Sequence, residues 1–296
     1  MSFSIVRPMN IVLSPFQNPF INLAVEDYFL RHSAHLPILF LYVNRPCVVM
    51  GRFQNPWVET NLKYLVDNDI WLVRRQSGGG CVFHDEGNLN FSFITPEPMI
   101  DRLKHVKLLQ EAFARAEIKL DISPRHDLWL DNKKISGSAF KQTKFGSFHH
   151  GTFLVNSNLD TLEECLKHSL IPKDSKSIAS VRSKVISLEQ KYPGIQIFDV
   201  VELIASFFKA PVQDIDASLL SLPEIQQGFY QLRDWPWLWG ETPLFELAEG
   251  MKVRKGLLED GRRFDRESMK DVFTNDRLDQ LFPDFSEQNM LSNQIL

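Results

Sequence analysis

The spacing of hydrophobic positions along the chain predicts more strands than helices. Short apolar or alternating runs, which are typical of strands, lie at residues 11–13, 38–43, 47–50, 70–73, 89–94, 127–130, 133–139 and 151–156. Apolar residues three and four apart, which are typical of amphipathic helices, lie at residues 22–31, 61–67, 100–116, 159–168 and 200–208. Because short turns join many of the strands, we expect an α+β fold with a mixed, largely antiparallel sheet and flanking helices.

The pattern changes after residue 228. Trp235, Trp237 and Trp239 fall within five residues, which predicts a linker anchored to the core by its indole rings. Beyond it, residues 245–258 suit a short hairpin and residues 265–281 a helix. We therefore predict a large domain at residues 1–228, followed by a linker and a small accessory α+β module at residues 229–296, too short to be very stable alone.

One stretch combines a permissive backbone with charge. Residues 74–84 read Arg-Arg-Gln-Ser-Gly-Gly-Gly-Cys-Val-Phe-His, between the strands predicted at 70–73 and 89–94. Glycine lets the backbone approach a ligand closely, and arginine offers a fork suited to carboxylate or phosphate. The stretch predicts a site for an anionic ligand with an elongated apolar part. A glycine-rich hairpin with surface charges explains the same residues equally well, since the spacing matches no known phosphate-loop motif.

A second stretch carries a lysine beside small residues. Asp131 and Asn132 are typical turn residues, and Lys134 opens a strand that continues with Ser136, Gly137 and Ser138. Small side chains leave one face of such a strand open, which suits a slot for a ligand. A lysine next to the slot would hold a phosphate or carboxylate. An ordinary surface lysine beside a hairpin is the alternative.

Composition sets limits on the partners. The chain has 296 residues, 44% of them hydrophobic, and a formal net charge of −4, so nothing attracts it as a whole to nucleic acid. Cys47, Cys81 and Cys165 are odd in number and widely spaced, which indicates free thiols in a reducing compartment and no metal cluster. No apolar run reaches the ~18 residues of a membrane span, and a signal-peptide pattern is absent. We expect a cytoplasmic monomer with no nucleic-acid or membrane partner.

Several segments in a fixed order carry a family resemblance between about residues 11 and 250. They lie at residues 22–26, 74–80, 84–90, 133–139, 148–152, 180–185 and 237–243. Together they resemble the lipoate-protein ligase family, a branch of the biotin and lipoate ligase superfamily. The resemblance implies that residues 1–228 form a biotin/lipoate ligase-like catalytic domain that binds lipoate and its adenylate.

The resemblance also implies a reaction in two steps. ATP and lipoate, with Mg2+, first give lipoyl-AMP and pyrophosphate. The ε-amine of a lysine on an acceptor then attacks the mixed anhydride to form an amide. The implied acceptors are the lipoyl domains of 2-oxo acid dehydrogenase complexes and the H protein of glycine cleavage. The enzyme must hold two anions together and exclude water, which is a task of positioning and electrostatics.

Roles for individual residues follow from the family pattern. Lys134 is the expected catalytic residue, in contact with the carboxylate and the α-phosphate, and Asp127 is the expected ligand of magnesium or of the phosphate region. Residues 177–184 resemble a mobile loop that closes over the adenylate. The expected substrate- and adenylate-binding residues are Arg74, Arg75, Ser77, Gly78, Gly79, Gly80, Cys81, Val82, His84, Asp127, Ser136, Gly137, Ser138, Ala139, His150, Gly151, Thr152, Ser180, Val181 and Arg182.

Departures from the family pattern leave alternatives open. Cys81 stands where the family more often has alanine or threonine, which raises acyl transfer between carrier proteins through a cysteine. Residues 52–57 resemble the lipoyltransferase branch as much as the bacterial ligases, and the C-terminal module is short, which favours an enzyme that uses ready-made lipoyl-AMP. The non-enzymatic alternative is a scaffold that binds lipoyl domains without chemistry. For His84, His150, Asp127 and Arg182, satisfied core histidines, a turn cap and a surface charge are the alternatives.

Overall fold

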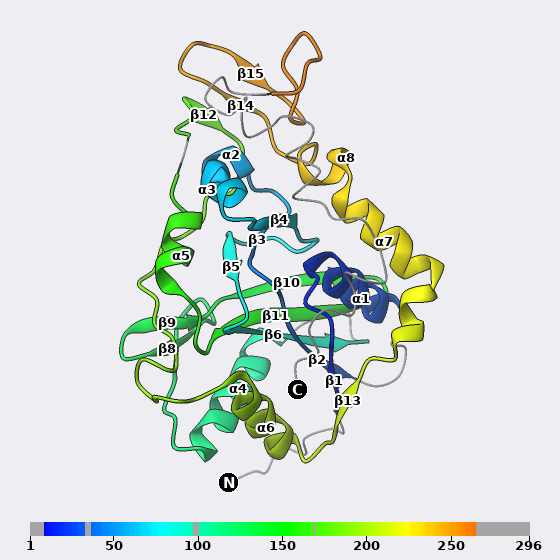
Figure 1. Ribbon diagram of the computed structural model, residues 1–296, viewed down its shortest axis with the longest axis vertical. Helices are drawn as coiled ribbons and strands as arrows, with labels where there is room; N and C mark the ends of the chain where they lie inside the picture. Colours follow the sequence, from blue (N-terminus) through cyan, green and yellow to red (C-terminus); the bar gives the residue numbers. More distant parts are fainter. Residues whose placement is uncertain (1–8, 33–36, 97–100, 169, 265–296) are drawn as a thin grey trace.

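A six-stranded sheet forms the centre of the computed structural model, which describes residues 9–32, 37–96, 101–168 and 170–264 (Figure 1). In spatial order its strands are β10 (Ser138–Thr143), β11 (Gly146–Leu154), β6 (Asn88–Thr95), β2 (Ile38–Val43), β1 (Asn10–Leu13) and β13 (Val212–Asp214). β1 runs parallel to β2 and to β13, and the other neighbours are antiparallel. The predicted α+β class with a mixed, largely antiparallel sheet is confirmed.

Three smaller sheets surround the central one. The first, in the order β4-β3-β5, consists of β3 (Cys47–Met50), β4 (Trp71–Arg74) and β5 (Val82–His84). The second consists of β7 (Asp121–Ile122), β8 (Leu128–Leu130) and β9 (Lys133–Ser136), and the third of β12 (Asp174–Ser175), β14 (Phe245–Glu246) and β15 (Lys252–Val253). β4 and β6 therefore lie in different sheets, with β5 between them in the chain, rather than forming one glycine-rich hairpin.

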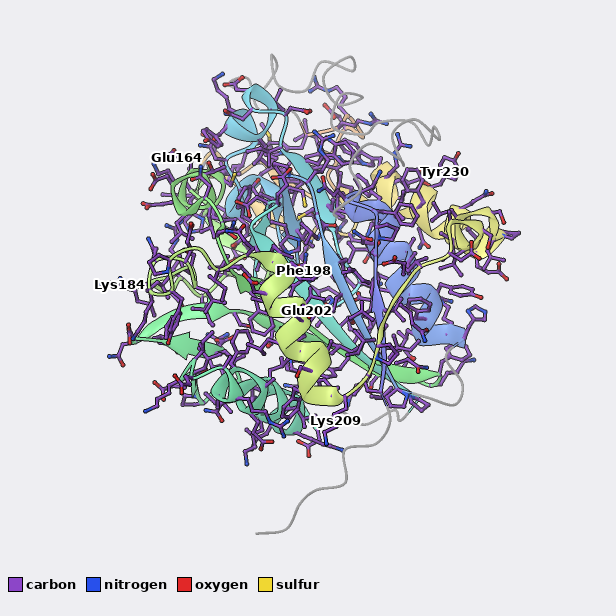
Figure 2. The ribbon with its side chains drawn as sticks, turned by 60° about the horizontal axis from the view of Figure 1, so that its bottom comes forward. Glu164, Lys184, Phe198, Glu202, Lys209 and Tyr230 are labelled. Atoms are coloured by element: carbon purple, nitrogen blue, oxygen red, sulfur yellow. The ribbon has the colours of Figure 1, made fainter. Side chains whose placement is uncertain are left out.

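Helices cover both faces of the central sheet. They are α1 (Pro19–His32), α2 (Pro56–Glu59), α3 (Leu62–Asp67), α4 (Arg102–Arg115), α5 (Leu159–Cys165), α6 (Ile197–Phe208), α7 (Pro223–Arg233) and α8 (Trp235–Leu238), with a 3-10 turn η1 (Ala217–Ser221). Figure 2 shows α6 running across the lower face, with α4 beside it. Within the described ranges, no helix combines the length and the apolar character needed to cross a bilayer.

The alternation of side chains along β2 divides the core into two layers. Leu39 and Leu41 pack with α4 and α6 on one face of the sheet, and Phe40 and Tyr42 pack with α1 and α7 on the other. This is the two-residue period of a strand buried on both sides. The second layer also takes in Val49 of β3, so the small β4-β3-β5 sheet faces the central sheet across it.

Several predicted elements differ in detail from the structure, among them the strand predicted at 151–156, which is β11 and begins at Gly146. The strand predicted at 133–139 is two strands, because the chain leaves the β8–β9 hairpin at Gly137 and enters the central sheet as β10. Residues 51–57, to which the hydrophobic pattern assigns neither strand nor helix, contain the start of α2, where the Asn55 side chain accepts a hydrogen bond from the Trp57 backbone nitrogen at 3.0 Å and caps the turn.

The segment after α7 packs on the main body. The Trp239 ring lies 5.0 Å from that of Trp57, and both belong to a core that includes Phe245 and Phe264. The predicted hairpin is confirmed by the antiparallel β14–β15 pair. Residue 228, the predicted boundary, falls inside α7, and the division into two domains stays a prediction. The helix predicted at 265–281 lies outside the described residues.

Candidate active site

A cavity of about 550 Å³, here called the central cavity, lies between the central sheet and the β4-β3-β5 sheet. Its walls come from β2, β6, β10 and β11 on one side and from β3, β5 and the glycine loop (residues 76–81) on the other. Most of the expected site residues line it. These are Arg75, Gly79, Gly80, Cys81, Val82, His84, Asp127, Lys134, Gly137, Ser138, Ala139, His150, Gly151, Thr152, Ser180 and Val181.

Lys134 lies on β9, where a tight hairpin positions it. Asp131 and Asn132 have φ values of 50° and 60°, the left-handed pair that joins two strands in the shortest hairpin turn. The Lys134 side chain is 24% exposed, and its Nζ lies 3.1 Å from Oδ1 of Asp127, whose side chain is 12% exposed. The cation and the carboxylate thus hold each other at the cavity wall, and an incoming anion would compete with Asp127 for the ammonium group.

The Arg75 side chain stabilises the conformation of the glycine loop through hydrogen bonds. Its guanidinium donates to the Val49 carbonyl at 2.9 Å, to the Gly78 carbonyl at 2.7 Å, to the Gly80 carbonyl at 2.8 Å and to Ser77 Oγ at 2.9 Å. Burial, as the largest cause, lowers its pKa to about 10, so it stays a cation at neutral pH. Because its donors are occupied by the loop, Arg75 holds the site's backbone in place and adds positive potential beside the cavity.

Two glycines are required by the close approach of the loop to the chain before it. Gly79 has φ +90°, a conformation that side chains other than glycine rarely adopt. A Cβ on Gly51 would lie 2.1 Å from the Gly79 carbonyl oxygen. Both positions therefore need glycine for the loop to keep this path.

A buried chain of hydrogen bonds links the glycine loop to β11 and α1. His150 Nδ1 lies 2.9 Å from Oε1 of Glu26, and His150 Nε2 lies 2.7 Å from Ser77 Oγ. Glu26, at 2% exposure, and Ser77, at 1%, are almost fully buried. Since Ser77 Oγ also accepts from Arg75, the chain runs from the Glu26 carboxylate to the arginine that shapes the loop. Glu26 belongs to the segment at 22–26 that carries part of the family resemblance, but no role was predicted for it.

Arg74 was expected to bind the ligand, and the structure places it elsewhere. It is fully buried, and it donates to the carbonyls of Arg52 at 2.6 Å, Gln54 at 2.8 Å and Leu238 at 2.9 Å, and to Thr242 Oγ1 at 2.9 Å. Alternation along β4 turns Arg74 to the side of the sheet away from the central cavity. Through these hydrogen bonds Arg74 links Leu238 and Thr242 to β4 and to the chain at residues 52–54.

Four other expected residues also lie off the central cavity's wall. Ser77 is buried against His150, as described above, and Gly78 contributes the carbonyl that Arg75 holds. Ser136 lines the second cavity instead. Arg182 also lines that cavity, and it donates to the Leu166 carbonyl at 3.0 Å.

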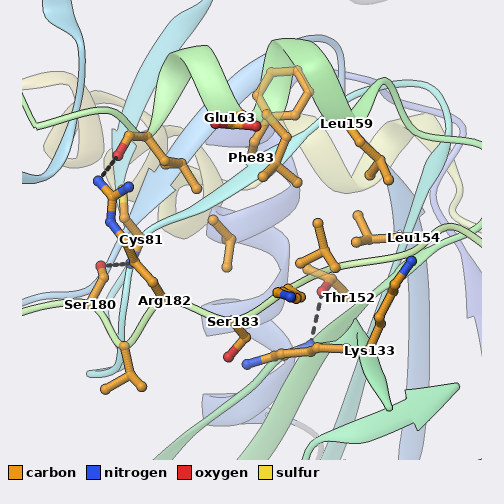
Figure 3. A pocket seen from close by; sticks show the side chains of 18 of the residues that line it. Cys81, Phe83, Lys133, Thr152, Leu154, Leu159, Glu163, Ser180, Arg182 and Ser183 are labelled. Carbon is orange, nitrogen blue, oxygen red and sulfur yellow. Dashed lines mark hydrogen bonds between the residues drawn. The ribbon is translucent and has the colours of Figure 1, made fainter. Parts of the chain in front are cut away.

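A second cavity of about 700 Å³, shown in Figure 3, shares part of its wall with the first. Its apolar wall includes Phe83 of β5 and Leu159 of α5, and its lysine and arginine residues are Lys133, Lys134, Arg182 and Lys184. The two cavities share walls. The shared residues are Cys81, Val82, Lys134, Gly137, Thr152, Ser180, Val181 and Ser183.

Ser180 connects the segment at 176–184 to the glycine loop. Its hydroxyl accepts from the Cys81 backbone nitrogen at 2.9 Å (Figure 3) and from Gln54 Nε2 at 2.9 Å. Its own backbone nitrogen donates to Glu59 Oε2 at 3.1 Å. One serine thus connects an otherwise exposed segment to the end of the glycine loop.

The cysteines are not poised to act as nucleophiles. Burial is the largest cause that raises the pKa of the Cys81 and Cys47 thiols far above the ordinary range, and it raises that of Cys165 to about 12. A thiol must ionise to attack an acyl group, and these thiols remain neutral at physiological pH.

We expect Cys81→Ser to keep acyl transfer within about threefold of the wild-type rate, because a neutral wall residue is replaced by one of similar shape. The measurement is acceptor modification in steady state, with Cys165→Ser as the matched control. A loss of more than a hundredfold in Cys81→Ser alone would instead assign the acyl group to this sulfur.

Some cavity-lining residues were missed by the sequence analysis. Leu23, Tyr42, Val49, Asn90 and Trp129 all line the central cavity. A signal was present in β6, where Asn88, Asn90 and Ser92 alternate with large apolar residues. Small polar side chains on one face of a buried strand indicate a cavity on that face.

Known proteins resemble this chain in sequence and in fold. The model of the lipoyl protein ligase A/B catalytic domain matches residues 18–209. Lipoate-protein ligase A of Psychrobacter cryohalolentis is 39% identical over 252 residues, which cover 80% of this chain and 74% of that protein. The chain belongs to the lipoyl protein ligase family. This confirms the resemblance on which the expected site residues depend.

Solved structures also share the fold. The crystal structure of P. falciparum LipL1 in complex with lipoate has a TM-score of 0.70 and 26% identity, and the match covers 86% of this chain and 84% of that one. An archaeal bipartite lipoate protein ligase from Thermoplasma acidophilum, described with its E2 lipoyl domain, has a TM-score of 0.62 and 25% identity. That match covers 77% of this chain and 95% of the other.

Proposed function

We propose that this chain is a lipoate-protein ligase that uses ATP to convert lipoate to lipoyl-AMP and then transfers the lipoyl group to a lysine. The observation that carries the proposal is that Lys134 and the glycine loop line one cavity, in a chain of the ligase family. We infer the acceptors to be lipoyl domains of 2-oxo acid dehydrogenase complexes and the glycine cleavage H protein. A cytoplasmic location and a monomeric state remain predictions.

The first step needs charge neutralisation at the cavity wall. A carboxylate oxygen of lipoate attacks the α-phosphorus of ATP, the bond to the β-phosphate oxygen breaks, and pyrophosphate leaves. The Lys134 ammonium, the positive potential of Arg75 and the amides of Gly79 and Gly80 would offset the approach of the two anions. The tail of the acid would occupy the central cavity, and the nucleotide would extend into the second cavity beside Lys133 and Lys184.

In the second step the acceptor lysine, as a free amine, attacks the carbonyl carbon of lipoyl-AMP. The carbon–oxygen bond to the phosphate breaks, AMP leaves with the electron pair, and the nitrogen loses a proton as the amide forms. Lys134 would hold the phosphate oxygen on which charge develops. The segment at 176–184 would exclude water, which otherwise hydrolyses the mixed anhydride.

Magnesium fits this site only as an ion that arrives with the nucleotide. No group of three potential metal-ligating side chains occurs among the described residues, and Asp127 is one carboxylate at the cavity wall. Mg2+ is commonly held by one or two carboxylates together with substrate phosphates. Asp127 would supply that carboxylate, and the ion would offset the charge of the leaving pyrophosphate.

The test is a mass measurement on an acceptor lipoyl domain, with two donors compared. ATP, Mg2+ and lipoate should lipoylate the acceptor, and so should preformed lipoyl-AMP. Activity with lipoyl-AMP alone would select the lipoyltransferase. Failure with both donors would contradict the proposal.

We also predict that lipoyl-AMP orders the segment at 176–184. Ile178 and Val181 are 48% and 61% exposed, so few apolar contacts hold the segment in the unliganded protein. Hydrogen exchange of its amides should slow by at least about tenfold when lipoyl-AMP binds, while the β10–β11 turn serves as the internal control. Unchanged exchange in both regions would contradict a closing role.

A further inference from the structure

Gln54 lies between the glycine loop and the segment at 176–184, in the connection from β3 to α2. Its side chain is fully buried. It lines neither of the two cavities, so it would not touch a ligand held there. A buried amide finds its hydrogen-bond partners within the protein, and the partners of Gln54 show what it holds in place.

These hydrogen bonds fix the orientation of the Gln54 amide. Oε1 accepts from the Gly51 backbone nitrogen at 2.9 Å. Nε2 donates to Ser180 Oγ at 2.9 Å and to the Ile178 carbonyl at 3.3 Å. A backbone N–H group only donates and a carbonyl only accepts, so the amide cannot be turned round without losing bonds at both ends. One side chain thus joins the chain at residue 51 to the segment at 176–184.

On one side, the turn that Gln54 closes packs against the glycine loop. The Gln54 backbone nitrogen also donates to the Gly51 carbonyl at 3.2 Å, and the Arg52 backbone nitrogen donates to the Ser77 carbonyl at 2.9 Å. The position where a Cβ of Gly51 would stand lies only 2.1 Å from the Gly79 carbonyl oxygen. A shift of this turn would therefore move the backbone of the glycine loop.

On the other side, Gln54 holds the Ser180 hydroxyl. The same oxygen accepts from the Cys81 backbone nitrogen at 2.9 Å, so both of its lone pairs are used and its proton is left to donate. Ser180 is half-buried and lines both cavities. A Cβ on Gly80 would lie 3.2 Å from Ser180 Oγ. A ligand that extends from one cavity into the other would therefore pass between Ser180 and the glycine loop.

We propose that Gln54 is a positioning residue for lipoyl-AMP, which holds Ser180 and the glycine loop at the separation that the adenylate needs. This inference rests on the proposed function and adds to it a residue that acts without touching the ligand. Lipoate would occupy the central cavity alone, whereas the phosphate and nucleotide of lipoyl-AMP would lie where the segment at 176–184 meets the loop. Groups held in place before binding need no reordering when the ligand arrives. Loss of Gln54 should therefore weaken lipoyl-AMP binding more than lipoate binding.

The test compares the Kd of lipoyl-AMP with that of lipoate, measured by calorimetry on the full chain without an acceptor. Gln54→Met keeps the length of the side chain and removes its hydrogen bonds. We expect the Kd of lipoyl-AMP to rise about tenfold or more and that of lipoate to change by no more than about twofold.

The matched control is Gln110→Met on α4. Gln110 is half-buried, its Nε2 donates to the Leu120 carbonyl at 2.7 Å, and it lines neither cavity. The same substitution there should leave both dissociation constants within about twofold of the wild type.

Equal changes for the two ligands in Gln54→Met, or no change for either, would overturn the inference and leave the proposed function standing. A wild type that binds neither ligand would instead contradict the proposed function. If Gln54→Met does not fold, hydrogen exchange of the Gln54 side-chain NH2 group in the wild type decides. Exchange should slow by at least about fivefold with lipoyl-AMP but not with lipoate, and equal exchange with both ligands would overturn the inference.

Discussion

Lys134→Met should abolish most ligase turnover while the protein stays folded. The substitution removes the only ammonium group that lines the central cavity among the described residues, and it keeps much of the aliphatic stem. Loss of one positioned charge at a developing anion costs about 10²–10³-fold in rate. We expect a loss of at least this size with lipoate and ATP, and a comparable loss in single turnover from preformed lipoyl-AMP.

The control for this variant is Lys144→Met, which removes an exposed lysine in the β10–β11 turn and should leave turnover within about twofold. Binding of the acceptor domain, measured by calorimetry, should be the same in both variants. If the protein were only a scaffold that binds lipoyl domains, the wild type itself would show no ligase turnover. Wild-type turnover in Lys134→Met would remove the lysine from the mechanism and leave the cavity without its expected catalytic group.

Arg74→Met should destabilise the protein rather than weaken ligand binding. The substitution leaves three buried carbonyl groups and the Thr242 hydroxyl without their donor. Unsatisfied buried polar groups cost about 1–3 kcal/mol each, partly offset here because a buried charge is also removed. We expect a loss of about 3 kcal/mol in the free energy of unfolding, measured with urea, and faster hydrogen exchange around residues 238–242.

The matched control is Arg31→Met on α1. The Arg31 side chain is 51% exposed and pairs with Asp27 one turn earlier, so its loss should cost no more than about 0.5 kcal/mol. The lipoate affinity of Arg74→Met, measured well below its unfolding temperature, should match the wild type within about threefold. A large loss of lipoate affinity with unchanged stability would instead show that Arg74 contributes to ligand binding.

Two of the strands that line the cavity, β2 and β3, could be predicted because burial on both faces produces unbroken apolar runs. β2 and β3 have the predicted bounds. α7 was missed although Ile225, Phe229 and Leu232 recur at helical spacing, because Gly228 suggested a boundary. In the structure, a Cβ on Gly228 would lie 3.3 Å from the Ala24 Cβ, so this glycine allows α7 to pack closely on α1.

The direction of each side chain was harder to predict than the identity of the site. Arg74 and Arg75 are adjacent and equally charged, yet alternation along a strand turns one toward the linker and the other toward the glycine loop. Tyr42 lines the cavity from a strand remote in sequence, and only the pairing of β2 with β6 brings it there. Such contacts depend on the tertiary fold, and local patterns do not contain them.

The most direct test of the central claim is a crystal structure of this protein with lipoyl-AMP. We predict the carboxyl–phosphate junction within about 3.5 Å of Lys134 Nζ and of the Gly79 or Gly80 amide, with the acyl tail in the central cavity. An adenylate bound outside that cavity, or one inside it with Lys134 still paired only to Asp127, would contradict the account.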